Sequence, residues 1–505
     1  MVFFFVKKLD KVKKAKNQKY THKGHLVYYI LIFTLMKPKI FKILYFSKET
    51  VILIKKIILS ENLKENFRKT DKDFTRNRIL TYDKMLILLL QKWVKSLQLR
   101  LNEFALKLDL MLSNSAFTQS RSKILPEVFD HLNLETIIKR FYDLKKNEAW
   151  YDTFWDFRIL AIDWSKIRLP DEKDIQEKYW KIKNINMNKK ESYYTGWILS
   201  VLHDALNNLA LDYILEESKY PEIALAIRNI QNLSKLPKIE NNDLIIMDRW
   251  YYSSFLISIF YAYNKDFLIR LKRKAIKEAE ELFDKNCKID SKTITLKVIN
   301  KESEYSEKYW ITIDKDLKEE VKIRLIRVIL DNWDIEVLAT SLLDEDKYKN
   351  EKFSELYFKR WWIEIYYDIL KNRLWLENFS WLTVNSILQD LSSSIFLSNF
   401  ETIITRSSNL ELEEKINKKN IKKDKKEENK IINKQKVNKN VSFNIIKNTL
   451  IELFLKEDSI DKTMDKIMKL FKTNPTQIRP WRTSERKTTV YKALNYHKRK
   501  KKNCF

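Results

Sequence analysis

The sequence predicts a mixed α/β fold with helical segments before and after it along the chain. From Thr81 to Tyr142 the apolar residues recur at helical spacing, which indicates a small helical domain. After Tyr151 the period changes, and an apolar strand ends at Asp163. Strands and helices then follow one another in an order that predicts a mixed sheet covered by helices.

The strands and helices expected in the α/β part lie between residues 157 and 272. Asn207-Asn208 separates two of the strands and favours a tight hairpin turn. Pro221 suits a helix start, because its fixed backbone angle matches the first turn. In order, we expect a strand that ends at Asp163, strands at 198–206 and 209–216, a helix at 223–233, a strand at 244–247 that runs into Asp248, a helix from Ser253 and a strand at 266–272.

Three further segments complete the predicted organisation. Residues of about 285–345 alternate between polar and apolar positions, so we expect an antiparallel β insertion before a long helix from Glu355. Residues 406–442 repeat Lys, Asn, Glu and Ile and cannot bury enough apolar surface to order, which predicts a linker. Residues 443–505 contain a last helical segment and a basic tail at 497–502.

Charge and composition limit the class of protein. The 505 residues carry 97 Lys and Arg against 68 Asp and Glu, a formal net charge of +29 that favours a polyanionic partner such as nucleic acid. An AT-rich genome that over-uses Lys codons explains the same excess. Two cysteines and five histidines provide neither a disulfide framework nor a usual structural zinc site. The apolar run at 26–36 is too short to span a bilayer, so we expect a cytoplasmic protein with no membrane partner.

One predicted helix carries a row of polar side chains. Tyr357, Arg360, Glu364 and Lys371 are spaced at i, i+3, i+7 and i+14, which at about 100° per residue places them within an arc of roughly 60°. The residues around them are mostly apolar and aromatic, which predicts a helix buried on most sides. Buried charges are costly unless they pair or bind something. An internal row of salt bridges or a solvated face is the plain alternative.

Two aspartates at predicted strand ends favour a catalytic interpretation of that row. Asp163 and Asp248 each follow an apolar strand, where a side chain leaves the sheet edge and can meet a packed helix. Each aspartate alone is more often a turn or helix cap. If both converge with Glu364, divalent cations must offset the repulsion of the carboxylates, and oxygen ligands favour Mg²⁺ or Mn²⁺. Two such ions can promote phosphodiester displacement.

These residues resemble those of a known family. Tyr-x2-Arg-x3-Glu-x6-Lys is the signature of the insertion-sequence-4-like DDE transposases, which have a ribonuclease H-like core. The blocks around the three carboxylates agree with it and read AIDWSKIRLPD, LIIMDRWYYSSFL and YFKRWWIEIYYDILKNRLWLENFSW. The family also has a β insertion between the second aspartate and the glutamate. The resemblance covers about residues 60–400.

The resemblance implies a fold, domains and residue roles. The fold is a ribonuclease H-like mixed sheet with the β insertion, and it occupies a catalytic core at 149–405. A helical DNA-binding domain at 36–148 precedes the core, and helices follow the linker. The implied catalytic and metal-binding residues are Asp163, Asp248 and Glu364, with two Mg²⁺ or Mn²⁺ ions, and the implied DNA phosphate-binding residues are Tyr357, Arg360 and Lys371.

By the same resemblance, we expect cut-and-paste transposition of the protein's own insertion sequence, through metal-dependent hydrolysis and strand transfer. The implied partners are double-stranded DNA, as terminal inverted repeats and as target, and a second copy of the chain in a synaptic homodimer. The implied location is the bacterial nucleoid. A catalytically inactive or repurposed sequence-specific DNA-binding protein is one alternative. A general ribonuclease H-like nuclease, which cuts without specific ends, is the other.

Glycine is scarce and tryptophan abundant, with two glycines and 14 tryptophans in the chain. Between two predicted strands, at Asp331-Asn332-Trp333, glycine suits the positive φ angles of a type I′ turn, whereas a bulky residue resists them. We interpret such tryptophans as UGA codons that mean glycine, and drift in a decaying element is the alternative. The positions where the resembled family has glycine are Trp164, Trp250, Trp333, Trp362 and Trp381, with Trp93, Trp180 and Trp375 as further candidates.

The N-terminal residues 1–35 resemble nothing in that family and are apolar and basic in composition. We expect them to be a spurious or unstructured extension. The predicted start of the native protein is therefore Met36 or a later codon.

Overall fold

The computed structural model of the protein describes most of the chain between residues 38 and 478. The described ranges are 38–76, 78–92, 95–143, 151–170, 172–178, 181–184, 192–217, 220–236, 243–331, 333–380, 382–424, 433–457 and 459–478. The predicted extension at 1–35 and the predicted basic tail at 497–502 lie outside these ranges. Within them, the search for a stretch of helix apolar and long enough to span a bilayer finds none.

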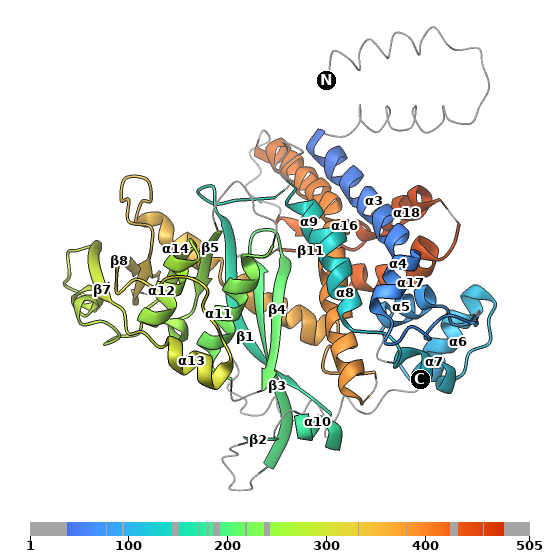
Figure 1. The fold of residues 1–505 in the computed structure, drawn as a ribbon. Helices are drawn as coiled ribbons and strands as arrows, with labels where there is room; N and C mark the ends of the chain where they lie inside the picture. Colours follow the sequence, from blue (N-terminus) through green and yellow to red (C-terminus); the bar gives the residue numbers. More distant parts are fainter. Residues whose placement is uncertain are drawn as a thin grey trace.

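A mixed sheet forms the centre of the molecule, as the sequence predicts (Figure 1). In the described ranges nine strands join in the order β2-β3-β1-β5-β6-β9-β8-β7, and β4 pairs with β3. β1 is parallel to β5 and β5 to β6, whereas the other pairs are antiparallel. The strands are β1 (Arg158–Arg168), β2 (Lys181–Asn184), β3 (Ser192–Asp204), β4 (Leu209–Glu217), β5 (Asp243–Met247), β6 (Asp266–Arg270), β7 (Ser291–Lys297), β8 (Glu320–Ile329) and β9 (Ile335–Thr340).

Most of the predicted strands are found near their expected positions. β3 and β4 form the predicted hairpin, and Asn208 in its turn has the positive φ of 56° that asparagine tolerates. The end of the first strand was predicted wrongly, because β1 continues past Asp163 to Arg168. Its antiparallel pairing with β3 runs on to Arg168, so polar residues beyond Asp163 still belong to the sheet.

The predicted β insertion adds three antiparallel strands to one end of the same sheet. β9 pairs with β6, and β8 and β7 follow outward. A helix that was not predicted, α13 (Glu302–Tyr309), lies between β7 and β8 in the sequence. The insertion therefore extends the central sheet instead of forming a separate one.

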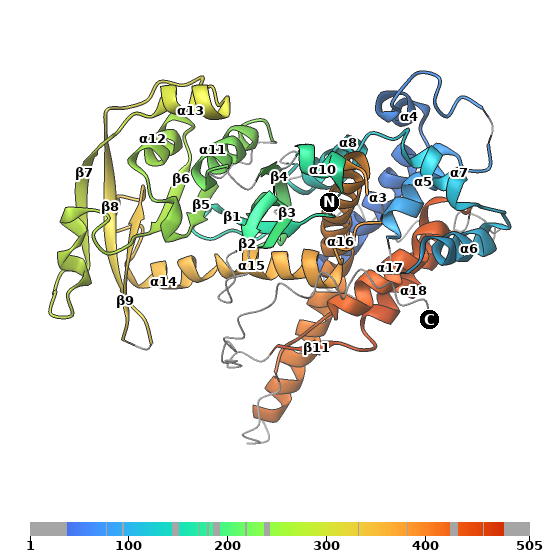
Figure 2. The ribbon, with the colours of Figure 1, turned by 90° about the horizontal axis from the view of Figure 1, so that it is seen from below.

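Helices cover both faces of the sheet (Figure 2). On one face lie α11 (Glu222–Leu233) and α12 (Ser254–Ala262), whose predicted counterparts began within one residue of these positions. On the other face, α14 (Glu351–Phe358) and α15 (Trp361–Asp368) cross the sheet from the side of β9 towards α16, followed by the π-helical turn η6 (Ile369–Arg373). The helix predicted from Glu355 thus begins one turn earlier and is broken at residues 359–360.

A second group of helices lies beside the sheet and combines the two ends of the described chain (Figure 1). The long helix α16 packs against α3, α5 and α8, and α17 and α18 pack against α3. The members are α3 (Pro38–Ile58), α4 (Glu61–Phe67), α5 (Tyr82–Leu90), α6 (Leu97–Leu108), α7 (Asn114–Arg121), α8 (Glu127–Leu132), η1 (Asn133–Ile138), α9 (Lys139–Phe141), α16 (Val384–Asp424), α17 (Lys439–Phe454) and α18 (Ile460–Phe471).

The segment predicted as a linker is partly helical. α16 extends to Asp424 and α17 begins at Lys439, so the expectation of an unordered linker at 406–442 is wrong for residues 406–424 and 439–442. Leu412 and Ile416 are 3% and 2% exposed, so two of the three apolar residues at 411–424 are buried, whereas Ile421 is exposed. Composition alone does not reveal this helix. Leu412 and Ile416 are spaced at i and i+4, and only helical geometry places them on a common face. Residues 425–432 lie outside the described ranges.

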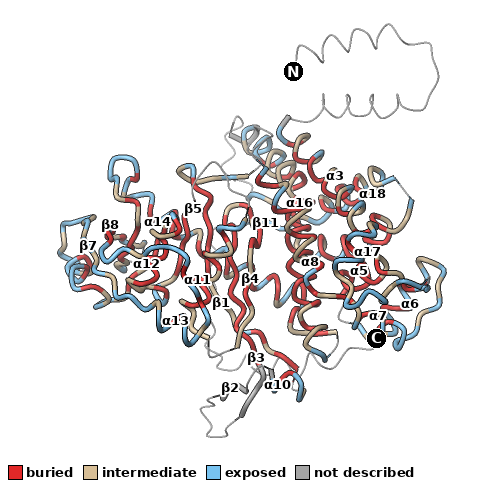
Figure 3. Tube along the Cα trace, in the orientation of Figure 1, coloured by how far each residue is buried: buried red, intermediate tan, exposed pale blue. Residues whose placement is uncertain are grey.

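The buried residues follow the sheet strands and the helices that pack on them (Figure 3). β5 is buried along its whole length, and α5 is almost entirely apolar and buried. One continuous core joins both helix groups to the sheet, and a smaller core lies under α14. The sheet and the helices beside it are therefore held as one packed body.

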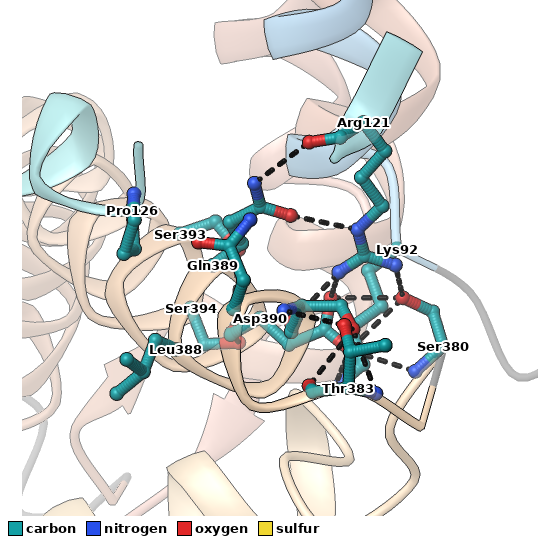
Figure 4. A network of polar contacts seen from close by, with 12 residues as sticks. Lys92, Arg121, Pro126, Ser380, Thr383, Leu388, Gln389, Asp390, Ser393 and Ser394 are labelled. Carbon is teal, nitrogen blue, oxygen red and sulfur yellow. Dashed lines mark hydrogen bonds and ion pairs between the residues drawn. The ribbon is translucent and has the colours of Figure 1, made fainter. Parts of the chain in front are cut away.

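A buried polar network joins α16 to the N-terminal helices (Figure 4). The carboxylate of Asp390 on α16 accepts a hydrogen bond from Arg121 Nη2 at 2.8 Å, and Lys92 Nζ lies 3.6 Å from it. Ser380 donates to the same carboxylate through its backbone N–H at 2.7 Å. Burial opposes ionisation of Asp390, but Lys92 and Arg121 outweigh it, so the pKa of Asp390 lies below its ordinary value.

Lys447 on α17 adds a further buried cation to this network. Burial, and the positive charges of Lys92 and Arg100, lower the pKa of Lys447 to about 7. An unfolded lysine titrates near 10.4, so between these values only the unfolded chain binds the proton. The free energy of unfolding should therefore rise with pH over this window, by about 1.4 kcal/mol per unit from this group.

Lys447→Met is expected to remove this part of the rise, because methionine fills the site without a charge. The measurement is denaturant unfolding of wild type and variant at pH values from 6 to 10. The exposed Lys462→Met is the control and should keep the wild-type slope. Parallel curves for wild type and Lys447→Met would contradict the assignment.

Candidate active site

Asp163 lies inside β1 at the level where the neighbouring strand β5 stops. The parallel pairing of β1 with β5 reaches Ala161↔Ile246, so two residues further on Asp163 is level with Asp248. Side chains in the same register of neighbouring parallel strands point to the same face of a sheet, and such strands are about 4.8 Å apart. The end of β5 therefore opens an edge beside Asp163.

Asp248 is the first residue after β5 and precedes a short 3₁₀ helix, Arg249–Tyr251. The strand before it is buried and apolar, which holds its carboxyl end firmly in the sheet. The two aspartates that the sequence singled out are thus brought together by neighbouring strands. Only one of them stands at a strand end.

Glu364 reaches the same edge from α15. The hydroxyl of Tyr367 donates to the carbonyl oxygens of Asp163 at 2.8 Å and of Leu199 at 3.0 Å, which fixes α15 on β1 and β3. One helical turn before Glu364, Arg360 Nη2 lies 2.9 Å from its carboxylate. The other terminal nitrogen of Arg360 lies 3.8 Å from Asp163 Oδ2. Arg360 therefore bridges the helix carboxylate and the strand carboxylate.

The row of four polar residues faces the sheet although the helix that carries it is irregular. Residues 359–360 form a turn, and a π-helical turn begins at Ile369. Arg360 nevertheless lies 5.9 Å from the ring centre of Tyr357, and Lys371 Nζ donates to Ser165 Oγ on β1 at 2.7 Å. The tertiary contacts with β1, not an ideal helix, keep these side chains on one face.

The prediction that this helix is buried on most sides is wrong. Phe358 is 65% exposed, and the exposed fractions of Trp361, Trp362 and Ile365 are 40%, 38% and 44%. The sheet covers one side of α15, and the opposite side faces outward. Apolar composition therefore gave a false impression of burial around the polar row.

The charges of the three carboxylates interact. The pKa of Asp163 is raised to about 6, mainly by burial, and the negative charges of Glu364 and Asp248 add to the rise. The backbone N–H of Trp164 and the charge of Arg360 oppose it. Asp163 therefore lies close enough to both carboxylates for repulsion between them to matter.

Two arginines pair with these carboxylates. Arg270 Nη2 lies 3.1 Å from Asp248 Oδ1, and the same guanidinium pairs with Glu336. Across the described ranges, no group of three or more His, Cys, Asp and Glu side chains is close enough together to hold a metal ion. The expected ligand cluster is thus not assembled, although its members share one sheet edge.

Sequence reasoning missed two charged residues of this edge, Arg270 and Glu222. Arg270 ends β6, and the parallel pairing of β6 with β5 reaches Met247↔Ile269, so Arg270 is level with Asp248. Burial and the charge of Asp248 raise the pKa of Glu222 on α11, whereas Trp164 and Lys272 lower it. The strand predicted at 266–272 placed Arg270 two residues before its end, so the strand-end signal that drew attention to Asp248 did not single it out.

The strands, the helix and the three carboxylates all lie in one segment of the chain that a family model recognises. Residues 155–400 match a transposase DDE domain. The DDE-domain match includes β1 from its start, the β insertion, the helix with Glu364 and the first turns of α16. A cryo-EM structure titled as a piggyBac transposase synaptic complex with hairpin DNA is similar at a TM-score of 0.41 and 11% identity, over 86% of this chain and 87% of that chain. No curated protein matches the chain.

Four tryptophans of the described chain have positive φ angles, Trp155, Trp310, Trp333 and Trp375. Trp333 has φ 64° in the β8–β9 turn, as predicted for a glycine position. Trp310 ends α13 with φ 50°, and Trp375 follows η6 with φ 57°. Helices often end at a left-handed residue, which is usually glycine. All four therefore stand where the backbone favours glycine, and Trp155 differs from the other three because it packs on neighbouring rings.

The other suspected positions that the structure describes within residues 155–400 have no positive φ angle that would favour glycine. Trp164 lies in a strand, Trp250 in a 3₁₀ turn and Trp362 in a helix, all without a positive φ. The remaining suspected positions, Trp93, Trp180 and Trp381, lie outside the described ranges. Among the positions suspected from the sequence, the backbone therefore supports recoded glycines at Trp333 and Trp375. The structure adds Trp310 as a further candidate.

Replacing Trp310, Trp333 and Trp375 together by glycine is expected to stabilise the protein. A left-handed backbone costs a bulky residue about 1 kcal/mol or more, and separate sites add, so the gain should be about 3 kcal/mol. The readout is the free energy of unfolding in denaturant. Trp155→Gly is the contrasting variant, because Trp155 packs 5.2 Å from the ring of Phe353 and should lose stability. A loss in the triple variant would contradict the glycine interpretation.

Proposed function

We propose that the chain is a DNA transposase that moves its own insertion sequence by cut-and-paste transposition, through metal-dependent hydrolysis and strand transfer. The observation that carries the proposal is the register of β1 and β5, which sets Asp163 level with Asp248, with Glu364 linked to Asp163 through Arg360. The match of residues 155–400 to a transposase DDE domain supports the same reaction class.

The charges at the site fit divalent metal. Asp163 and Glu364 share Arg360, and Asp248 and Glu336 share Arg270. Four carboxylates against two guanidinium groups leave a formal charge of −2 on these ion-paired residues. All the candidate ligands are carboxylate oxygens, which Mg²⁺ and Mn²⁺ prefer. Asp163, Asp248 and Glu364 would hold two ions, which would activate the attacking oxygen and stabilise the leaving one.

Three basic or hydroxyl side chains of the α14–η6 segment are proposed to bind DNA phosphates. The hydroxyl of Tyr357 is buried and has no hydrogen-bond partner among the described residues. Arg360 has two carboxylate partners that would pass to metal, which would leave its guanidinium for a phosphate. Lys371 holds Ser165 and the carbonyl of Lys166, so it would place positive charge two to three residues beyond Asp163.

The N-terminal helices are proposed to bind the ends of the element. A hollow of about 760 Å³ lies between α4, α5 and the loop after α4. Its wall includes exposed basic side chains with no acidic partner in the described chain, Lys72, Arg76 and Arg78. Such cations suit a DNA backbone. A homodimer that joins two ends, at the nucleoid of a bacterial cell, completes the proposal.

Incubation with labelled DNA that carries the element's own terminal inverted repeats tests this function. In Mg²⁺ the protein should cut at the repeat boundary and then join the ends to a target plasmid. Because Trp164 and Trp250 stand beside the aspartates, the chain with glycine at positions 164, 250, 333, 362 and 381 is assayed in parallel. Absence of cleavage by both forms would contradict the proposal.

The exposed indole of Trp250, 60% accessible beside Asp248, motivates a second candidate function. A bulky side chain there would crowd the metal site and leave a DNA-binding protein without catalysis. That protein would bind the repeats with steep salt dependence and cut nothing, even with glycine restored. A general nuclease would instead cut DNA that lacks the repeats equally well.

A further inference from the structure

Arg270 contacts Asp248 through its guanidinium, and it comes from a neighbouring strand. Its Nη2 lies 3.1 Å from Asp248 Oδ1, and its other terminal nitrogen pairs with Glu336 on β9. The side chains of Arg270 and Asp248 are 25% and 24% exposed, so solvent screens the pair only in part. A positive charge is thus built into the edge where the proposed metal ligand stands.

The contact with Asp248 is more than a cross-strand salt bridge. β6 and β9 are antiparallel, and Arg270 is level with Leu338, two residues from Glu336. Glu336 alone would satisfy a structural ion pair between these two strands. Asp248 gives the guanidinium a second carboxylate partner, while its Nε is buried without a partner in the described chain. Arg270 therefore directs one of its terminal nitrogens to a residue of the proposed metal site.

We propose that Arg270 is a positioning residue that holds Asp248 in the metal-free protein and competes with divalent metal for its carboxylate. The inference rests on the proposed metal-dependent function. A carboxylate oxygen at 3.1 Å from a guanidinium is oriented towards that cation and is partly neutralised by it. Asp248 must turn from Arg270 to bind metal, and Glu336 keeps Arg270 in place when it does.

Two variants should change the metal affinity in opposite directions. Arg270→Gln removes the competing charge, so Mn²⁺ should bind more tightly, by about tenfold or more for a partly buried pair. Glu336→Gln leaves Arg270 with Asp248 as its remaining carboxylate partner, so Mn²⁺ should bind more weakly. Arg270→Lys keeps the charge and should remain near wild type. A purely structural role would not produce this opposite pair of shifts.

Calorimetric titration of the DNA-free full-length protein with Mn²⁺ provides the test. Arg273→Gln is the matched control, because Arg273 is exposed three residues away and packs on Phe283, so its Mn²⁺ affinity should equal that of wild type. Circular dichroism establishes that each variant is folded. If Arg270→Gln does not fold, Glu336→Gln and Arg270→Lys still decide the question.

The outcomes separate this inference from the proposed function. Tighter binding in Arg270→Gln and weaker binding in Glu336→Gln, both abolished by adding Asp248→Asn, support the competition. Equal affinity in wild type, Arg270→Gln and Glu336→Gln, all lost with Asp248→Asn, would overturn the role of Arg270 alone. Absence of Mn²⁺ binding in wild type and Arg270→Gln alike would overturn the metal site and this inference with it.

Discussion

Asp248→Asn is expected to reduce Mg²⁺-dependent cleavage of the element's ends by about a thousandfold or more. The amide keeps the size of the side chain but removes the negative charge that a metal ligand needs. Asp163→Asn and Glu364→Gln should give losses of the same order, because all three carboxylates would serve one reaction. Cleavage is measured as product formed per minute on end-labelled DNA, in the form of the protein that proves active.

The matched control for these variants is Asp368→Asn, an exposed carboxylate one turn beyond Glu364 on the same helix. It should cut at the wild-type rate. End binding, measured by gel shift in Ca²⁺, should survive in every variant, since the proposed end-binding residues lie elsewhere. Retained cleavage in any one of the three active-site variants would remove that residue from the mechanism.

Asp390→Asn is expected to lower the free energy of unfolding by about 3–5 kcal/mol, which is the usual cost of breaking a buried ion pair. The carboxylate of Asp390 is 1% exposed and is held by Arg121, Lys92 and Ser380. Its removal leaves two buried cations without their counter-charge. A loss of this size is a large part of the stability of an ordinary domain.

Denaturant unfolding of Asp390→Asn against Asp346→Asn measures this effect. Asp346 is fully exposed and, within the described chain, pairs with Lys349, so its replacement should change stability by less than about 0.5 kcal/mol. Similar small losses in both variants would show that the cations of the network are satisfied without Asp390. A variant that fails to fold at 25 °C agrees with the prediction.

The arrangement around the carboxylates was predictable where local pattern and sheet geometry agree. Buried parallel strands read as apolar runs, so β5 and the start of β1 were visible in the sequence. Asp248 follows such a run directly, and its partner Asp163 is level with it because the strands are neighbours. The polar row from Tyr357 to Lys371 was also visible, since its spacing is helical.

Features that depend on tertiary contacts were not predictable in this way. β1 continues beyond Asp163 because β3 pairs with it there. The end of β1 therefore depends on the length of β3, which the residues of β1 do not indicate. The outward side of α15 is as apolar as the inward side, so composition could not separate them. The partners of Arg270 are Asp248 and Glu336, which lie 22 and 66 residues away in the sequence. Local sequence pattern could therefore not identify them.

The position of α16 also determines when the protein can complete its fold during synthesis. α16 lies against α3, and Ser47 of α3 donates to the carbonyl of Ile403 across 356 residues of sequence. At about 5–20 residues per second, the ribosome needs tens of seconds to make the chain between them. Until then the apolar face of α3 has no partner from α16, and contacts so distant in sequence form slowly. The apolar face of α3 therefore stays without this cover, and open to aggregation, until α16 has been made.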